Sequence, residues 1–476
     1  MKKLLVLFKD HIWEFLLIVI FGFLFFYRLD WVTLGSWDEA WYGSIARTIS
    51  QTNEWMLMEF NGEPYFDHPP MGFWLMAISY KLFGISEFST RLPSALLGVM
   101  SAILMYRTSV LLFGKKVVGF SAALILGTAV WYVLRVRSGN LDSPFVFFYI
   151  LTIYLSLLSR KNMKLFPIAM VAFGALMLTK TLVGISALPV IGLILFSQLL
   201  KPMKHWKWIL AGLASFAVLV LPWYYIQKET YSNFIEHHFF TIGTRGNSAS
   251  SYLHLEYELP LFYLHMGVRK WYKLWILAGG TLLISLKFLK PKTFIVLIWN
   301  AIILYPFLTT DETHIWHLIP VYIPLALITS YGIWSLGEIG MSIIKKTMNE
   351  KVIQTLYLIG IVLIASIQIK IFYHEVIPQS KYTPDDVDIS MRVSKYDKTI
   401  FLDDDYLPLA VYYSDREMKQ MAYEPEERKT LINLFSSNEQ DFVAITRSWA
   451  VGNLDAEGLE YKILEQNKSF SIVSRP

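Results

Sequence analysis

Long runs of apolar residues, separated by short turns that carry lysine or arginine, make up most of this chain and restrict its fold more than any other feature. Roughly 20 apolar residues are needed to cross a bilayer, and about eleven stretches approach that length when shorter ones with clear flanks are accepted. These stretches lie near residues 12–29, 92–113, 117–134, 141–159, 164–179, 182–200, 207–226, 272–289, 293–309, 318–338 and 353–373. The sequence therefore predicts a polytopic α-helical membrane protein of about eleven transmembrane helices with additional juxtamembrane helices.

The composition agrees with a membrane protein. Of the 476 residues, 54% are hydrophobic and 17% are charged, whereas soluble proteins carry about 25% charged residues. The 16 tryptophans and 27 tyrosines are suited to the membrane–water boundary. The net charge of +5 comes from dispersed lysines, which argues against a nucleic-acid partner. The absence of cysteine excludes disulfides and thiolate metal sites.

The basic residues of the turns predict the orientation of the chain, because cytoplasmic loops are enriched in lysine and arginine. We interpret the first apolar run as a retained membrane helix, since no small-residue cleavage site follows it. With a cytoplasmic N-terminus, every inner turn is basic: Lys115 and Lys116; Arg160, Lys161 and Lys164; Lys201, Lys204 and Lys207; Lys287, Lys290 and Lys292; Lys345, Lys346 and Lys351. Four basic residues fall on the outer side instead and become candidates for function: Arg135, Arg137, Arg269 and Lys270.

The odd helix count places the C-terminus on the outer side of the cytoplasmic membrane. We predict a transmembrane domain over residues 1–373, with outer loops near 30–91 and 227–271, and an extracytoplasmic α/β domain over 374–476. At roughly 100 residues this domain is long enough for a core of its own. Short strands are predicted at 399–402, 441–446 and 470–474, and helices at 407–413 and 426–435.

The first group of polar residues at an outer helix end surrounds Asp38. Ser36 and Glu39 have the spacing of a capping box, which predicts a helix start. Three apolar residues share one face of that helix and predict that it lies along the membrane surface: Trp41, Ile45 and Ile49. Asp38 is not needed for the cap, and a carboxylate at this place can act as general base toward an incoming hydroxyl.

A second group lies between prolines. Pro64, Pro69 and Pro70 restrict the backbone on both sides of Asp67 and His68. These two side chains belong either to a solvated turn or to a site that binds a metal or a phosphate.

Two further residues stand alone at the ends of apolar runs. Asp142 either caps the helix that follows it or contributes a functional carboxylate. Lys180 either extends its ammonium to the membrane surface or meets a lipid phosphate, because positively charged residues are disfavoured in outer turns.

Histidines mark two other outer positions. Glu236, His237 and His238 have metal-binding side chains, although adjacent residues on a helix face different ways. His314 and His317 are three residues apart, which suits either a metal site or simple placement at the membrane interface.

No Walker loop, dinucleotide fingerprint or nucleophile elbow occurs in the sequence, so no nucleotide cofactor is expected. Charged residues are scarce inside the apolar runs and gather at their outer ends, unlike the midplane sites of ion-coupled transporters. Three hypotheses remain: a membrane enzyme, a transporter or flippase of a lipid-linked or small polar substrate, and a membrane scaffold. The scaffold hypothesis leaves the outer cluster of polar residues unexplained.

The motifs together resemble the C-type membrane glycosyltransferases (GT-C), above all the bacterial aminoarabinose transferase of lipid A and the protein O-mannosyltransferases. The resemblance runs in order through residues 37–47 (Trp-Asp-Glu-Ala-Trp-Tyr-Gly-Ser-Ile-Ala-Arg), 65–70 (Tyr-Phe-Asp-His-Pro-Pro), 83–94, 174–180, 236–237 and 322–324. The external α/β tail is similar too. His68 stands where relatives usually have lysine, and Trp41 where a close relative often has arginine.

The resemblance implies an inverting enzyme that moves a sugar from a polyprenyl-phosphate donor to a lipid, glycan or protein acceptor outside the cytoplasm. It implies catalytic roles for Asp38, toward the acceptor, and Asp142. It implies that Lys180 meets the donor phosphate, and substrate-binding roles for His68, Arg91 and Arg137. A divalent metal ion is the cofactor that it implies, near Asp67 and His237. The expected partners are thus the lipid-linked donor, the acceptor and membrane lipids.

Overall fold

The computed structural model describes residues 11–35, 37–180, 182–199, 202–243, 255, 257–284, 291–309, 314–343, 349–421 and 429–476. Several residues named above lie outside these ranges: Ser36, Lys201, Lys287, Lys290, Lys345, Lys346 and the first part of the predicted helix at 426–435. The chain divides into two compact units. The first comprises Met1–Tyr27, Phe66–Gly72 and Arg91–Ile377, and the second comprises Arg28–Tyr65, Phe73–Thr90 and Pro378–Pro476. The second unit thus joins parts of the first outer loop to the C-terminal residues, which the sequence assigned to separate domains.

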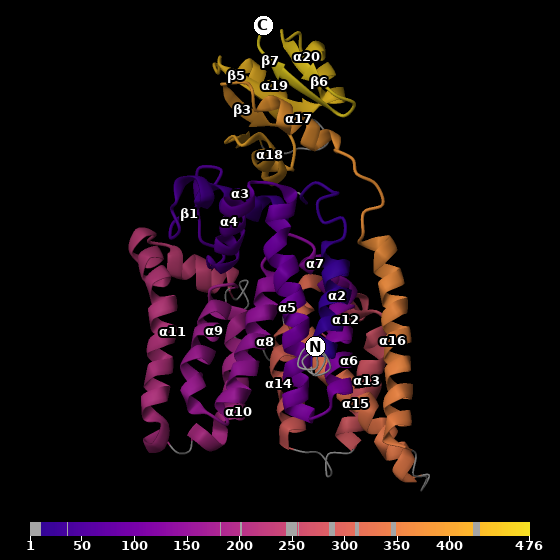
Figure 1. Cartoon of the computed structure of the whole chain (residues 1–476). Coiled ribbons are helices and arrows are strands. Elements are labelled where there is room, and N and C mark those ends of the chain that lie inside the picture. Colours follow the sequence, from indigo (N-terminus) through magenta and orange to yellow (C-terminus); the bar gives the residue numbers. More distant parts are fainter. Residues whose placement is uncertain are drawn as a thin grey trace, which may run out of the picture. The chain divides into compact units, whose positions relative to one another are not determined.

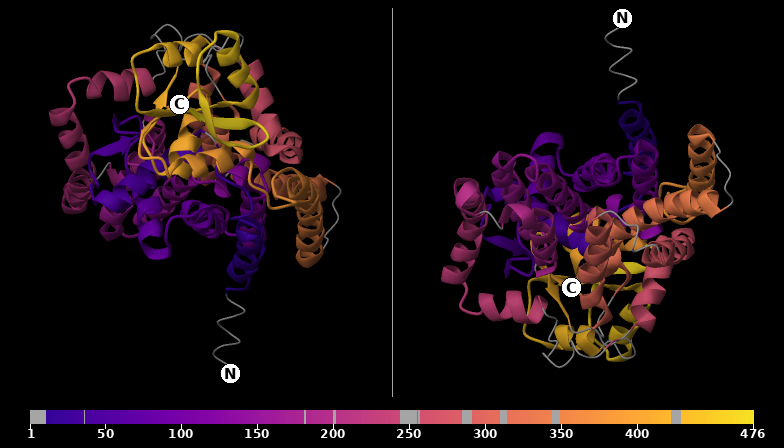
Figure 2. Two further views of the ribbon diagram at one scale, coloured as in Figure 1. Left: turned by 90° about the horizontal axis from the view of Figure 1, so that it is seen from above. Right: turned by 90° about the horizontal axis from the view of Figure 1, so that it is seen from below.

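The first unit is built from helices that run side by side (Figure 1) and are seen along their axes in Figure 2. Its α-helices are α2 (Ile12–Phe26), α5 (Glu87–Phe113, counted with this unit from Arg91), α6 (Lys116–Gly127), α7 (Val130–Val136), α8 (Asp142–Ser159), α9 (Phe166–Met177), α10 (Ala187–Leu199), α11 (Pro202–Thr230), α12 (Glu258–Val268), α13 (Lys270–Ile284), α14 (Pro291–Leu304), α15 (Tyr322–Ile343) and α16 (Glu350–Glu375). The π-helix η3 covers Glu236–Ile242, and 3-10 helices cover Met163–Leu165, Leu182–Ser186, Tyr305–Leu308 and Ile315–Val321.

Among the described residues, five helices are long and apolar enough to cross a membrane, or six when the bent pair α6 and α7 counts as one span. Five shorter apolar helices accompany them. In the spans of α11 and α16 only 17% of the most apolar window is buried inside the protein, so their exposed apolar side chains need a nonaqueous environment. A helical protein with several apolar helices is confirmed, and the count of eleven spans stays a prediction.

Two spans form the interior of the first unit. The most apolar window of α8 is 72% buried, and that of the span Ile315–Gly340, which contains α15, is 89% buried. Helices α8 and α11 pack against α9, and α13 packs against α15. Three fully buried tryptophans fill space between helices: Trp223, Trp271 and Trp299. The side chains at the ends of α8 and α15 therefore lie among closely packed neighbours.

The second unit contains α3 (Asp38–Thr52), the antiparallel hairpin β1–β2 (Met58–Phe60 and Glu63–Tyr65), most of α4 (Met71–Phe83) and a five-stranded sheet. The sheet order is β4-β3-β5-β7-β6, with strands Lys419–Gln420, Thr399–Leu402, Phe442–Arg447, Phe470–Ser474 and Lys462–Gln466. Strand β3 pairs in parallel with β4 and β5, whereas β7 is antiparallel to β5 and β6. Its helices are α17 (Asp385–Val393), α18 (Leu407–Ser414), α19 (Lys429–Ser436) and α20 (Gly452–Ala456).

The apolar face of α3 is packed inside the second unit. Ile45 and Ile49 are fully buried, and the ring of Trp41 lies 5.5 Å from Phe60 and 5.7 Å from Tyr65. The prediction that this face lies along a membrane surface is therefore wrong. Periodicity identifies an apolar face, but it does not distinguish burial in lipid from burial in protein.

Candidate active site

A buried carboxylate held by two cations forms the centre of the candidate site in the first unit. Lys180 donates a hydrogen bond from Nζ to Oδ1 of Asp142 over 2.5 Å. Arg135 donates from Nε to the other oxygen, Oδ2. Asp142 is only 3% exposed, so both oxygens act inside the protein, where charges interact strongly. The group carries one net positive charge, which favours an anion beside it.

The structure shows which groups the side chains of Asp142 and Lys180 contact. Asp142 is the first residue of α8, and among the described residues its carboxylate accepts from the side chains of Arg135 and Lys180 and from no backbone N–H. Instead Asn140 accepts a hydrogen bond from the backbone N–H of Asp142 over 2.8 Å. The Lys180 side chain is 19% exposed and points to Asp142. The capping role and the extension of Lys180 to the surface are therefore not observed.

Residues 66–72, which include Pro69 and Pro70, are bound next to Asp142 and Lys180. The N–H of Met71 donates to the carbonyl of Leu178 over 2.8 Å, two residues before Lys180. Gly72 lies against Leu141, the neighbour of Asp142, so closely that a Cβ at Gly72 would lie 2.2 Å from Leu141 Cδ2. Only glycine permits this approach. Residues 66–72 are thus held beside the Asp142–Lys180 pair.

The same segment is held from its other side by the π-helix η3. Asp67 Oδ1 and His237 Nε2 are 2.6 Å apart. His238 donates from Nδ1 to the carbonyl of Phe66 over 2.9 Å, and burial lowers the pKa of His238, which keeps its ring neutral. Adjacent His237 and His238 both contact the segment, and the π-helix η3 has more residues per turn than an α-helix, so adjacent side chains diverge less. Single π-helical turns are frequent at functional sites. Sequence reasoning missed the role of His238 because it assumed α-helical geometry.

Tyr322, at the start of α15, is a further polar residue whose role sequence reasoning missed. It is 1% exposed, and among the described residues its hydroxyl has no hydrogen-bond partner. Gly267 lies against this hydroxyl, because a Cβ at Gly267 would be 1.8 Å from the oxygen. Tyr322 also interacts electrostatically with Asp142. A buried hydroxyl without a partner costs free energy, and that signal is visible only in three dimensions.

The remaining predicted substrate-binding residues occupy different surroundings. Arg137 donates to the carbonyls of Leu24, Phe25 and Tyr27 at 2.8–3.1 Å, and thereby satisfies the C-terminal end of α2. Burial and the charge of Arg91 lower the pKa of Arg137 to about 10. Arg91 is itself buried, and His68 is half-buried in the turn after Asp67. The described contacts of Arg137 are therefore structural.

The second histidine pair has a local role. His317 accepts a hydrogen bond at Nδ1 from the N–H of His314 over 3.0 Å, at the start of the 3-10 helix Ile315–Val321. Within the described ranges, no three side chains of His, Cys, Asp or Glu gather in a way that would hold a metal ion. The contact between His314 and His317 thus caps the start of this helix, and both alternatives for the pair stay predictions.

Asp38 belongs to the second unit, where it opens α3. Its side chain is half-buried, while that of its neighbour Glu39 is 8% exposed. Glu39 accepts a hydrogen bond from the N–H of Gly35 over 2.9 Å. Glu39 therefore binds the loop before the helix, and Asp38 is not used for this contact.

A family model described as dolichyl-phosphate-mannose-protein mannosyltransferase matches residues 67–226. An uncharacterized protein of Aquifex aeolicus is 32% identical over 40% of this chain and 39% of its own length. An undecaprenyl phosphate-α-4-amino-4-deoxy-L-arabinose arabinosyl transferase of Pectobacterium carotovorum is 26% identical over 67% of this chain and 59% of its own length. The chain thus spans less than two thirds of the length of these relatives.

Solved structures show the same architecture. ArnT from Cupriavidus metallidurans, bound to undecaprenyl phosphate, superposes with a TM-score of 0.70 at 17% identity, over 97% of this chain and 98% of ArnT. The oligosaccharyltransferase AglB from Archaeoglobus fulgidus gives a TM-score of 0.57 at 11% identity, over 92% of this chain and 70% of AglB. Together these comparisons confirm the resemblance predicted from the sequence motifs.

Proposed function

We propose that this chain, which has the fold of the C-type membrane glycosyltransferases, is an inverting glycosyltransferase that takes its sugar from a polyprenyl-phosphate donor. The acceptor would be a lipid, a glycan or a protein at the outer face of the cytoplasmic membrane. The N-terminus would lie inside and the C-terminal residues outside, as the basic turns predict.

The observation that carries this proposal is the Asp142–Lys180–Arg135 group, with the buried hydroxyl of Tyr322 within electrostatic range of Asp142. A polyprenyl phosphate leaves with negative charge, so its departure is assisted by fixed positive charge and by hydrogen-bond donors in a dry site. The net positive charge of the group meets the first need, and Tyr322 supplies a donor that has no partner among the described residues. A phosphate oxygen that accepts from Tyr322 would recover the free energy of the unsatisfied hydroxyl.

The proposal assigns distinct tasks to the two carboxylates. Asp142, held by two cations, stays ionised and keeps Lys180 in place, so its catalytic role is to position positive charge. Asp38, which is half-buried, would take the proton of the acceptor hydroxyl as general base. Single displacement at the anomeric carbon then inverts its configuration.

The proposal includes a divalent metal ion that takes its ligands from the protein and from the donor together. Asp67 and His237 would hold it, since their oxygen and nitrogen already lie close together. Metal ions in phosphate chemistry are often bound by one or two protein side chains and completed by phosphate and water. The ion would supply additional positive charge at the phosphate.

The decisive experiment gives the purified protein a panel of polyprenyl-phosphate sugars and measures release of polyprenyl phosphate. We expect one donor to be cleaved, and the Asp38→Asn variant to lose at least about a hundredfold in turnover, as for general bases. A transporter would move the donor between leaflets without cleaving it. Cleavage of none of the donors, or full turnover in Asp38→Asn, contradicts the proposal.

A further inference from the structure

The helix that carries Asp38 is bound by the C-terminal part of the second unit at positions before and after that residue. The contacts come from α18 and the residue that follows it. Tyr413 accepts a hydrogen bond from the N–H of Leu34 over 2.9 Å and donates to Glu87 Oε1 over 2.8 Å. Burial raises the pKa of Tyr413, so its hydroxyl keeps the proton that it donates. The backbone that leads into Asp38 is thus held by one phenol.

The next turns of α3 are held by Tyr412. A Cβ at Gly43 would lie 2.9 Å from Cε2 of Tyr412 and 3.1 Å from the hydroxyl of Tyr80. The absence of a side chain at Gly43 therefore allows the Tyr412 ring to rest on the helix backbone. The Tyr412 hydroxyl in turn hydrogen-bonds Thr90 Oγ1 at 3.2 Å.

One turn later, Arg47 completes the attachment. Its guanidinium donates to the carbonyl of Tyr412 over 2.5 Å and to Asp415 Oδ1 over 2.7 Å, and it lies 4.5 Å from the centre of the Tyr412 ring. Arg47 is 8% exposed. The Asp415 side chain is exposed, so the buried part of this attachment is the hydrogen bond from the Arg47 guanidinium to the Tyr412 carbonyl, and hydrogen bonds from a charged donor are the strong ones.

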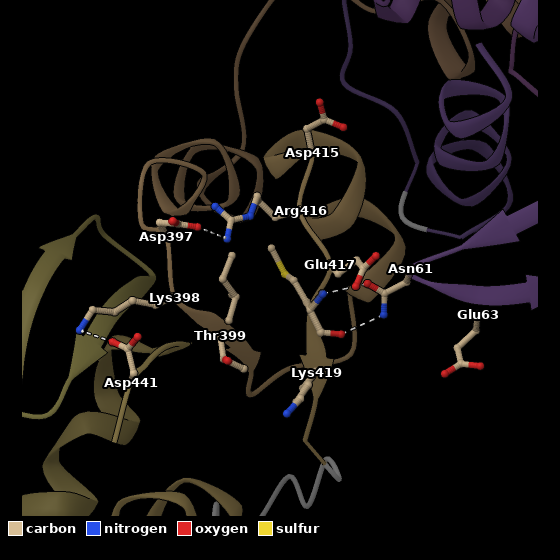
Figure 3. Close-up of a pocket in the computed structure, with 12 residues that line it drawn as sticks. Asn61, Glu63, Asp397, Lys398, Thr399, Asp415, Arg416, Glu417, Lys419 and Asp441 are labelled. Carbon is tan, nitrogen blue, oxygen red and sulfur yellow. Dashed lines mark hydrogen bonds and ion pairs between the residues drawn. The ribbon is translucent and has the colours of Figure 1, made fainter. Parts of the chain in front are cut away.

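The hairpin β1–β2 is bound independently. The amide of Asn61 donates from Nδ2 to the carbonyl of Met418 over 2.9 Å and accepts from its N–H at Oδ1 over 2.8 Å. Figure 3 shows this double contact at the edge of a polar cleft of about 840 Å³, which Asp415 also lines. The first outer loop is therefore attached to the C-terminal residues at two separate places.

We propose that Tyr412 and Tyr413 are positioning residues for Asp38, so that the C-terminal residues set the catalytic geometry of the acceptor step. This inference rests on the proposed function, because it takes Asp38 as the base. Small displacements of a reacting group cost large factors in rate. The attachment of α3 is made by Tyr412, Tyr413 and Asp415, which belong to the short helix α18 and its C-cap.

The test uses the full-length protein and separates rate from binding. Tyr413→Phe removes the hydroxyl that joins Leu34 to Glu87 and keeps the ring. We expect kcat to fall about tenfold with the donor KM unchanged, and amide hydrogen exchange at Leu34 to become faster. The matched control is Tyr461→Phe, which removes a hydroxyl that donates to the exposed Asp455, and it should keep wild-type kcat.

A second variant, Gly43→Ala, tests the same positioning role in case Tyr413→Phe misfolds. Gly43→Ala favours the helical state of α3 but places a methyl group against Tyr412, so it should lower kcat in the same way while α3 stays helical. Wild-type kcat in Tyr413→Phe despite faster exchange at Leu34 overturns the positioning role, and the proposed function survives if Asp38→Asn is still inactive. Absence of donor cleavage by the wild-type protein overturns the proposed function and this inference with it.

Discussion

Lys180 Nζ lies 2.5 Å from Asp142 Oδ1, although 38 residues separate the two in the chain. Since Asp142 also accepts from Arg135, removal of the carboxylate takes one acceptor from each of two half-buried cations. Removal of the lysine leaves one cation on the carboxylate. The two side chains are therefore coupled but not equivalent.

This coupling is tested by a double-mutant cycle. Lys180→Met should raise the donor KM about tenfold to a hundredfold, as for loss of a charged hydrogen bond. Asp142→Asn should raise the donor KM too, and in addition it should lower the free energy of unfolding by about 3–5 kcal/mol. In the double variant, the loss of donor binding and the loss of stability should each be smaller than the sum of the losses in the two single variants. Donor titration measures the first and thermal unfolding measures the second. Lys381→Met, at an exposed lysine, is the control, and strictly additive losses would refute the coupling.

Tyr322→Phe should separate function from stability. Because the Tyr322 hydroxyl has no partner among the described residues, its removal should not lower the unfolding temperature, while turnover falls about tenfold. Tyr357→Phe gives the opposite pattern, since that hydroxyl donates to the Ser330 carbonyl over 2.8 Å and its loss should cost stability alone. A marked loss of stability in Tyr322→Phe would show that the hydroxyl is satisfied inside the protein.

Gly267→Ala should displace the Tyr322 hydroxyl, because Gly267 lies against it. The new methyl group would lie 1.8 Å from the Tyr322 oxygen, so the ring must move and both stability and turnover should fall. Tyr322→Phe in the Gly267→Ala background should restore part of the stability without restoring turnover. Thermal unfolding and donor cleavage of the four combinations measure this, and no recovery of stability would contradict the steric explanation.

Chelation tests the metal at Asp67 and His237. We expect a strong chelator to remove a divalent ion from the protein and to lower turnover, and added ion to restore it. His237→Ala should contain less metal than the wild-type protein, whereas His374→Ala, at an exposed histidine, should contain the same amount. Unchanged turnover after complete chelation, with no metal in the purified protein, would exclude this cofactor.

The sheet of the second unit should lose stability in acid through Asp404. Burial opposes the ionised form of Asp404, but its hydrogen bond from Arg447 Nε, 2.5 Å long, holds the pKa of Asp404 below its ordinary value. A pKa depressed in the folded state stabilises the protein above the unfolded pKa, about 3.9, and this stabilisation is lost as the pH falls through the folded value. Asp405 acts in the opposite direction, because burial and Asp404 raise its pKa.

We therefore expect Asp404→Asn to lower the stability of this unit by about 1–2 kcal/mol at neutral pH and to weaken the acid dependence below pH 4. Hydrogen exchange of strands β3 and β5 between pH 3 and pH 7 gives the measurement, after correction for the intrinsic exchange rate. Asp397→Asn, at a fully exposed carboxylate, is the control. An unchanged acid profile in Asp404→Asn would refute this assignment.

Sequence reasoning predicted those parts of the fold that depend on local pattern. The strands β3, β5 and β7 and the helix α18 lie where alternation and apolar spacing predict them. The two-residue strand β4 and the exposed strand β6 were missed, because short or solvent-facing strands have little hydrophobic pattern.

The candidate site was predicted less completely, because its contacts join distant segments. Asp142 and Lys180 were identified singly from their unusual places beside apolar runs, but their pairing depends on how α8 packs beside the end of α9. Arg137 was assigned to substrate from its unusual outer position, whereas its described contacts are with the carbonyls at the end of α2. No local pattern indicates such a contact between residues more than 100 positions apart.

The second unit is assembled from three separate stretches, and the last begins at Pro378. A ribosome adds roughly 5–20 residues per second, so residues 28–90 must wait on the order of tens of seconds before the strands and helix α18 that complete their unit have been synthesised. During this interval the loop of residues 28–90 lacks the elements that complete its unit, so we expect it to be accessible to proteases and chaperones. A nascent chain arrested before Pro378 should accordingly be cleaved within this loop by an added protease, and release of the full-length chain should protect it.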